Sequence, residues 1–167
     1  KRYMSIDIDG AHGAIPLDLN FDEVPGDQDV RYGLVTNHGT AEHIINQANV
    51  FKVIHDLTAP GGLMLNVSPF IGWFDHGFFN YQPNFFQALA RYNAYEMLGL
   101  WVNHDKKVEC VPLLEWCCPE NSVIEMGQNY LLVTLMRKTQ DAEFFLPVQG
   151  HYEAGLPPAS RARYRPL

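Results

Sequence analysis

The pattern that decides the fold is the stretch VRYGLVTNHGTAEHIINQANVFKVIHDLTAPGGLMLNV (residues 30–67). Residues 30–36 are apolar enough to predict a strand that is buried on both faces. Residues 41–57 carry apolar side chains at helical spacing, and Pro60 with the following glycine pair predicts the end of that helix. Residues 63–67 predict another strand. Strand, helix and strand in this order predict a βαβ unit with parallel pairing.

The rest of the chain supplies shorter elements on either side of this unit. Residues 3–9 and 14–19 predict two short strands, separated by a glycine-containing turn. Residues 84–98 predict a helix, and residues 100–112 and 123–136 predict two late strands. An irregular segment with Cys117 and Cys118 separates these two strands. Together these elements predict an α/β fold.

Composition and charge exclude several functional classes. The chain has 167 residues, of which 47% are hydrophobic, so it can bury one domain core. The net charge is −7 and the twelve basic residues are scattered, so we expect no nucleic-acid partner. No apolar run approaches the length of a membrane span, so we expect no membrane partner. Three cysteines do not form a disulfide framework, and a reducing, cytoplasmic location is expected.

Acidic and amide side chains follow the ends of successive predicted strands. Asp7 and Asp9 end the first strand, Asp18 ends the second, and Asn37 follows the strand at 30–36. In an open parallel sheet, ligands bind outside the carboxyl ends of the strands. One carboxylate can accept hydrogen bonds from both ribose hydroxyls, and another can accept one from an adenine amine. The pattern therefore favours a nucleoside ligand.

Several stretches resemble the class I S-adenosylmethionine-dependent methyltransferases. They are SIDIDG (5–10), AIPLDLN (14–20), the stretch at 33–67, and HGFFNYQPNFFQALARYNAYE (76–96). The resemblance covers about residues 3–97 and continues more weakly to residue 138. It implies a Rossmann-like, mostly parallel sheet with helices on both faces and an antiparallel C-terminal strand. It also implies a methyltransferase-like domain at 1–138 and a C-terminal extension at 139–167.

The resemblance also implies roles for individual residues in methyl transfer from S-adenosyl-L-methionine to a small-molecule substrate. Asp7, or alternatively Asp9, would bind the ribose, and Asp18 with Leu19 would contact the adenine. The loop residues beside the methionine part of the cofactor would be Asn37, His38 and Gly39. The substrate-side residues would be Glu42, Asn80 and Tyr81. His43 and His76 are the candidate catalytic bases, because histidine as a residue type titrates near neutrality.

One part of the family pattern has no counterpart in this sequence. The family begins with a strand and a glycine-rich turn, and no such pattern precedes residues 3–9. The implied strand order places this missing first strand between residues 3–9 and residues 30–36. We therefore expect an N-terminal segment or a second chain to complete the sheet, and a homodimer is one form that this would take.

Other interpretations of the same residues stay open. Asp9 and Asp18 are also typical turn residues. A non-catalytic interaction or dimerisation module is the main functional alternative. A metal-dependent hydrolase is another, with His38, Glu42 and His43 in one stretch and Asp75 and His76 in a second. The spacing of the first stretch is one residue longer than the known HxxEH helix motif.

Overall fold

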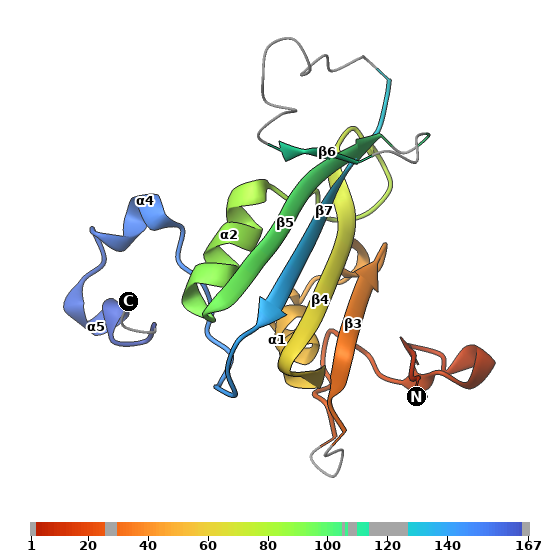
Figure 1. The fold of residues 1–167 in the computed structure, drawn as a ribbon, viewed down its shortest axis with the longest axis horizontal. Coiled ribbons are helices and arrows are strands. Elements are labelled where there is room, and N and C mark those ends of the chain that lie inside the picture. Colours follow the sequence, from red (N-terminus) through yellow and green to blue (C-terminus); the bar gives the residue numbers. More distant parts are fainter. Residues whose placement is uncertain (1–2, 26–29, 105, 107–109, 114–126, 165–167) are drawn as a thin grey trace.

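The computed structural model describes residues 3–25, 30–104, 106, 110–113 and 127–164. Its main feature is a five-stranded sheet with the strand order β3-β4-β7-β5-β6, beside a two-stranded sheet of β1 and β2 (Figure 1). The elements in chain order are β1 (Ile6–Asp7), η1 (Ala11–Gly13), β2 (Ile15–Pro16), β3 (Tyr32–His38), η2 (Ala41–His43), α1 (Gln47–Leu57), β4 (Thr58–Ile71), α2 (Pro83–Tyr92), β5 (Tyr95–His104), β6 (Cys110–Pro112), β7 (Tyr130–Lys138), α4 (Gly150–Glu153) and α5 (Pro158–Arg161).

The parallel unit predicted from residues 30–67 is confirmed, with changed boundaries. β3 pairs with β4 in parallel, and α1 connects them. The predicted helix at 41–57 is divided, because Asn46 caps α1 by accepting a hydrogen bond from the backbone N–H of Asn49. Residues 41–43 form the separate 3-10 turn η2. The helix stops at Leu57, and the residues that follow it directly already belong to β4.

The predicted Rossmann-like, mostly parallel sheet with helices on both faces is wrong. Only β3 and β4 are parallel in the five-stranded sheet, and β7 lies between β4 and β5, antiparallel to both. β7 pairs along one edge with β4 and along the other with β5, and the antiparallel strand beside β4 is what rules out a mostly parallel sheet. Both long helices contribute to one core, where Phe51 of α1 contacts Phe85 and Phe86 of α2.

The core lies between these two helices and one face of the sheet. On β4 and β7 the residues of that face pair directly, Met64 with Met136 and Ser68 with Leu132. Each of these four side chains is buried. The opposite face of the same strands is only half-buried. No helix in the described ranges is long and apolar enough to cross a bilayer.

β3 lies at the edge of the five-stranded sheet, which corrects the prediction of a strand buried on both faces. Leu34 in its middle is 53% exposed. The predicted strands at 3–9 and 14–19 shrink to the two-residue strands β1 and β2, which pair in parallel with each other. Within the described residues β1 and β3 form no strand pair. The expected N-terminal segment or second chain between them stays a prediction.

Two further boundaries differ from the sequence predictions. The helix predicted at 84–98 ends at Tyr92, because Asn93 leaves helical geometry and Ala94 has a positive φ of 51°. β5 therefore begins at Tyr95. The predicted segment with Cys117 and Cys118 lies outside the described residues.

Candidate functional site

Three residues from two distant segments meet in one cluster: Glu42 and His43 of η2 and His76 of the loop after β4. Their ligand atoms all lie within 4.8 Å of one another. Glu42 Oε1 is 3.6 Å from His76 Nε2 and 4.0 Å from His43 Nε2. Both distances exceed hydrogen-bond length, so the three groups face each other across a small space. We call these three residues the Glu–His–His cluster.

Local hydrogen bonds place η2 at the carboxyl end of β3. Asn37, in β3, accepts a hydrogen bond from the backbone N–H of Ala41 through its Oδ1 atom, at 3.1 Å. Gly39 turns the chain between them with a φ of 70°. The backbone carbonyl of Glu42 then accepts a hydrogen bond of 2.8 Å from the N–H of Phe78. This bond attaches the loop after β4 to η2.

The loop that carries His76 is anchored at both ends. Trp73 donates from its backbone N–H to Asn129 Oδ1 at 2.9 Å and from its indole to the Tyr130 carbonyl at 2.9 Å. At the other end, the backbone N–H of Tyr81 donates to the Pro69 carbonyl at 2.7 Å. These hydrogen bonds fix both ends of the loop. Trp73 has a positive φ of 58°, an uncommon backbone conformation for a residue with a side chain.

Gly77 allows this loop to approach η2 closely. A Cβ atom at this position would lie 3.0 Å from the Glu42 carbonyl oxygen, 3.1 Å from Glu42 Cγ and 3.3 Å from His43 Nδ1. Any larger residue would push against the backbone of η2. The glycine next to His76 is therefore part of the geometry that brings His76 to the other two cluster residues.

Glu42 is an unusual carboxylate because it is buried without a Lys or Arg partner among the described residues. Its side chain is 1% exposed, and its ion-pair contacts within these residues are the two histidines. Its Oε2 atom has no hydrogen-bond partner in the described part of the chain. Burial raises the pKa of Tyr81, and the nearby charge of Glu42 acts in the same direction. A buried carboxylate of this kind requires a compensating positive charge or a proton.

The two histidines are open to solvent. The side chains of His43 and His76 are 45% and 39% exposed, and their rings meet edge to face with centroids 5.0 Å apart. The indole of Trp73 packs against the His76 ring with centroids 4.8 Å apart. The cluster thus has a buried acidic side and an accessible imidazole side.

A cavity of about 330 Å³ lies between the first segment of the chain and β3. Its walls are mainly residues 3–6, β3 and α1, and its polar lining includes Ser5, Thr36, Asn37 and Thr40. The predicted cofactor residues Leu19 and Asn37 line it. The volume falls in the lower range for small-molecule pockets.

The predicted acids lie near this cavity but do not line it. Asp7 directly follows the lining residue Ile6, and its side chain is exposed. Asp9 Oδ1 accepts a hydrogen bond from the N–H of Ala11 at 2.8 Å, and Asp18 Oδ1 accepts one from the N–H of Asn20 at 2.9 Å. Both contacts are typical of acids in turns.

The other predicted site residues are distributed as follows. Gly39 is close to the cluster, because a Cβ there would lie 3.7 Å from Glu42 Oε1. His38 and Asp75 are exposed and do not belong to the Glu–His–His cluster. Asn80 donates to the Gly72 carbonyl, and Tyr81 donates from its hydroxyl to Gln47 Oε1 at 2.6 Å.

Sequence reasoning did not predict the contacts that Trp73 and Gly77 make with the cluster residues. The signal that could have found them is GWFDHG (72–77), in which two glycines enclose an aromatic residue and a histidine directly after a strand. Such glycines indicate tight backbone geometry next to a potential ligand.

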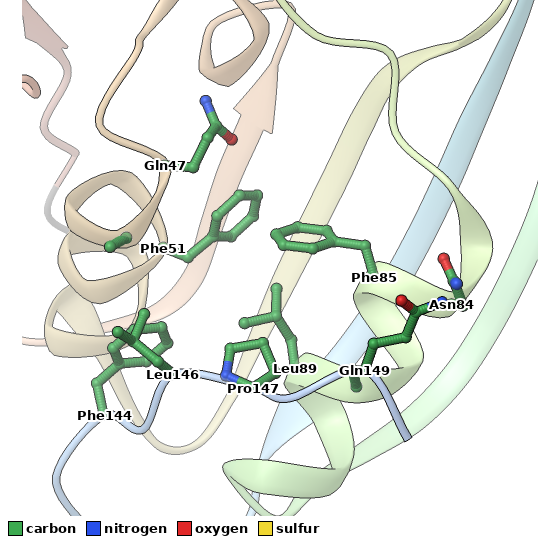
Figure 2. A pocket seen from close by; sticks show the side chains of 11 residues that line it. Gln47, Phe51, Asn84, Phe85, Leu89, Phe144, Leu146, Pro147 and Gln149 are labelled. Carbon is green, nitrogen blue, oxygen red and sulfur yellow. The ribbon is translucent and has the colours of Figure 1, made fainter. Parts of the chain in front are cut away.

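A second cavity of about 440 Å³ lies between α1, α2 and residues 144–149. Figure 2 shows the rings of Phe51 and Phe85, which pack edge to face, among the lining residues, with Leu89 and Pro147 below them. Among the described residues, no acidic or basic side chain lines this cavity. The part of its lining that the structure describes therefore offers apolar contact surface and amide side chains.

Comparisons of this chain with family models, with curated proteins and with solved structures find no match.

Proposed function

We propose that this chain transfers a methyl group from S-adenosyl-L-methionine to an oxygen or nitrogen of a small molecule. The observation that carries the proposal is the cavity between residues 3–6 and β3, at a parallel pair of strands with polar residues at the carboxyl end of β3. Such ends are where parallel strands bind ligands. The proposal rests on this local arrangement and requires no mostly parallel sheet.

In this proposal the cavity takes the adenosine part of the donor. Asp7 is the last residue of β1, and Asp18 lies two residues after the end of β2, so both lie at the carboxyl end of this parallel pair. Asp7 would accept hydrogen bonds from the ribose hydroxyls and Asp18 one from the adenine amine. The cavity lining, which is mostly apolar and includes Tyr32, would pack against the base.

The Glu–His–His cluster lies on the acceptor side. During transfer the bond between sulfur and methyl breaks, and the acceptor atom forms the new bond to carbon. The sulfonium becomes a neutral thioether, and the acceptor loses a proton to the cluster. The transfer depends mainly on in-line positioning of the two reactants. A cytoplasmic location, inferred from the cysteine content, belongs to the same proposal.

The test is calorimetric titration of the intact chain with S-adenosylhomocysteine. We expect saturable binding to one site per chain, and Asp7→Ala and Asp18→Ala should each weaken it by about 10-fold or more, because each removes a charge-assisted hydrogen bond. Glu143→Ala is the matched control, because it removes an exposed acid outside the site and should leave affinity unchanged.

A cavity-filling variant tests the location of the adenosine separately from the role of the two acids. Val35 lines the cavity and is half-buried, so Val35→Phe should occupy the space and abolish binding while the chain stays folded. If the wild-type chain binds no S-adenosylhomocysteine, the methyl-transfer proposal is wrong and the interaction-module alternative gains support. Full affinity in both Asp variants would remove these acids from the site.

A further inference from the structure

We infer that the Glu–His–His cluster is a binding site for one divalent first-row transition-metal ion. Two imidazoles and one carboxylate are a ligand set that such ions accept, and sites of this composition keep coordination positions open. The three residues come from two segments separated by more than thirty residues, and the fold brings their ligand atoms within 4.8 Å of one another.

The distances fit an ion between the three groups better than direct contact. Nitrogen and oxygen ligands at about 2.1 Å from an ion lie roughly 3.0–3.4 Å from each other. The contact between Glu42 and His76 is 3.6 Å, and that between Glu42 and His43 is 4.0 Å. Small side-chain rotations at the two exposed histidines close the remaining gap.

The burial of Glu42 is an independent reason for a cation at this place. Its side chain is almost fully buried, and its Oε2 atom is unpaired among the described residues. A bound divalent ion supplies the missing positive charge, and the second oxygen can join the first in coordination. Mg²⁺ and Ca²⁺ prefer oxygen ligands, so the two imidazoles select a transition-metal ion.

The neighbouring residues hold the ligands in place. Phe78 donates to the backbone of Glu42, Trp73 packs on the His76 ring, and Gly77 permits the close approach of the loop. The exposed sides of both imidazoles leave room for a water molecule or a substrate atom on the ion. An acceptor hydroxyl bound to the ion would release its proton to solvent water more easily, because the ion stabilises the resulting alkoxide. The histidines would then act as ligands in place of the base role in the proposed function.

The effect of the ion on an acceptor hydroxyl rests on the proposed function, but metal binding itself is testable without a methyl donor. The probes are Co²⁺, followed by its visible absorption bands, and Zn²⁺, followed by calorimetry and by competition against Co²⁺. We expect one ion per chain. Glu42→Gln and His76→Asn should each lower Zn²⁺ affinity by at least about 100-fold, since loss of even a second-shell partner costs 10–100-fold.

Controls distinguish ligand loss from damage to the fold. His12→Asn replaces an exposed histidine outside the cluster and should bind Zn²⁺ like the wild-type chain. Gly77→Ala keeps all three ligands but crowds Glu42, so it should weaken binding. Without metal, Glu42→Gln should unfold at the same or a higher temperature than the wild-type chain, because it removes a buried charge. With Zn²⁺, the wild-type chain and His12→Asn should gain thermal stability, and Glu42→Gln should gain much less.

Two results would overturn the inference. One is the absence of saturable Co²⁺ and Zn²⁺ binding by the folded wild-type chain. The other is an equal loss of affinity in His12→Asn and His76→Asn. A chain that binds Zn²⁺ but no S-adenosylhomocysteine supports the metal site and rejects methyl transfer, and the reverse result rejects the metal site alone.

Discussion

His55 shows at the scale of one residue how burial sets a protonation state. Its Nε2 atom is 2.7 Å from the Ala142 carbonyl oxygen, and its Nδ1 atom is 2.6 Å from the Tyr95 hydroxyl. A carbonyl can only accept, so Nε2 carries the hydrogen and Nδ1 accepts from Tyr95. Burial lowers the pKa of His55, and the charge of Lys138 acts in the same direction. The folded protein therefore holds this imidazole neutral.

The buried neutral His55 should therefore make the stability of the folded chain sensitive to acid. Because its pKa is lower in the folded than in the unfolded chain, the unfolded chain binds more protons once the pH falls below the ordinary value of 6.5. The stability contributed by the neutral imidazole is complete above pH 6.5 and is lost as the pH falls toward the folded pKa. His55→Gln should unfold more easily at pH 7.5 but lose less stability between pH 7.5 and 5.5 than the wild-type chain.

The measurement is urea unfolding of both chains at several pH values in this window. His12→Asn, at an exposed histidine, is the control and should show the wild-type dependence. If the free energy of unfolding changed equally with pH in His55→Gln and in the wild-type chain, His55 would not be the source of the acid sensitivity.

At the scale of the element, a row of polar side chains crosses the centre of the sheet. Asn37 of β3 donates to Asn66 Oδ1 of β4 at 3.3 Å, and Asn66 donates to Thr134 Oγ1 of β7 at 3.2 Å. The three residues are direct neighbours in the strand register, and all are buried. A one-residue slip of any strand would break the row, so it helps to specify the register.

Removal of the middle residue tests this row. Asn66→Ala leaves the buried amide of Asn37 and the hydroxyl of Thr134 without these partners, and we expect a loss of about 2–3 kcal/mol in the free energy of unfolding. Denaturant unfolding measures it. Asn84→Ala, at an exposed position of α2, is the control and should change stability by less than about 0.5 kcal/mol. Similar values for the two variants would mean that the row contributes nothing.

At the scale of the whole molecule, residues 142–148 close the helical side of the core. Asn93, just after α2, donates to the Phe145 carbonyl at 2.9 Å and accepts from the Phe145 N–H at 2.7 Å. The ring of Phe144 packs on His55 of α1 with centroids 5.7 Å apart. This segment therefore connects the ends of both long helices, as Figure 1 shows in blue beside α2.

Loss of the Asn93 side chain should release this segment. Asn93→Ala removes both hydrogen bonds to Phe145, and we expect about 2 kcal/mol less stability. Limited proteolysis with chymotrypsin should cut near Phe144 and Phe145 faster than in the wild-type chain, whereas Asn84→Ala should be cut at the wild-type rate. Equal cleavage of Asn93→Ala and the wild-type chain would show that apolar packing alone holds the segment.

The sequence alone predicted those parts of the fold and site that depend on local patterns. Residues 30–67 contain a complete strand, helix and strand, so the parallel pair β3 and β4 could be predicted. The sequence also singled out Glu42 as a substrate-side residue and His43 and His76 as candidate bases, but not as one cluster. It could not predict that β7 enters between β4 and β5, because pairing between distant strands depends on which edges the rest of the chain leaves available.

Thus the periodicity of apolar residues and the positions of glycine, proline and capping side chains determined where most elements lie along the chain, because they act on the nearest few residues. The tertiary structure decided what the elements do together. It placed β3 at the edge of the main sheet and reduced the strands predicted at 3–9 and 14–19 to the short pair β1 and β2. It also brought a buried carboxylate and two imidazoles from two distant segments into one cluster. Contacts of this kind are made across space, and the burial that gives Glu42 its chemistry exists only after the chain has packed.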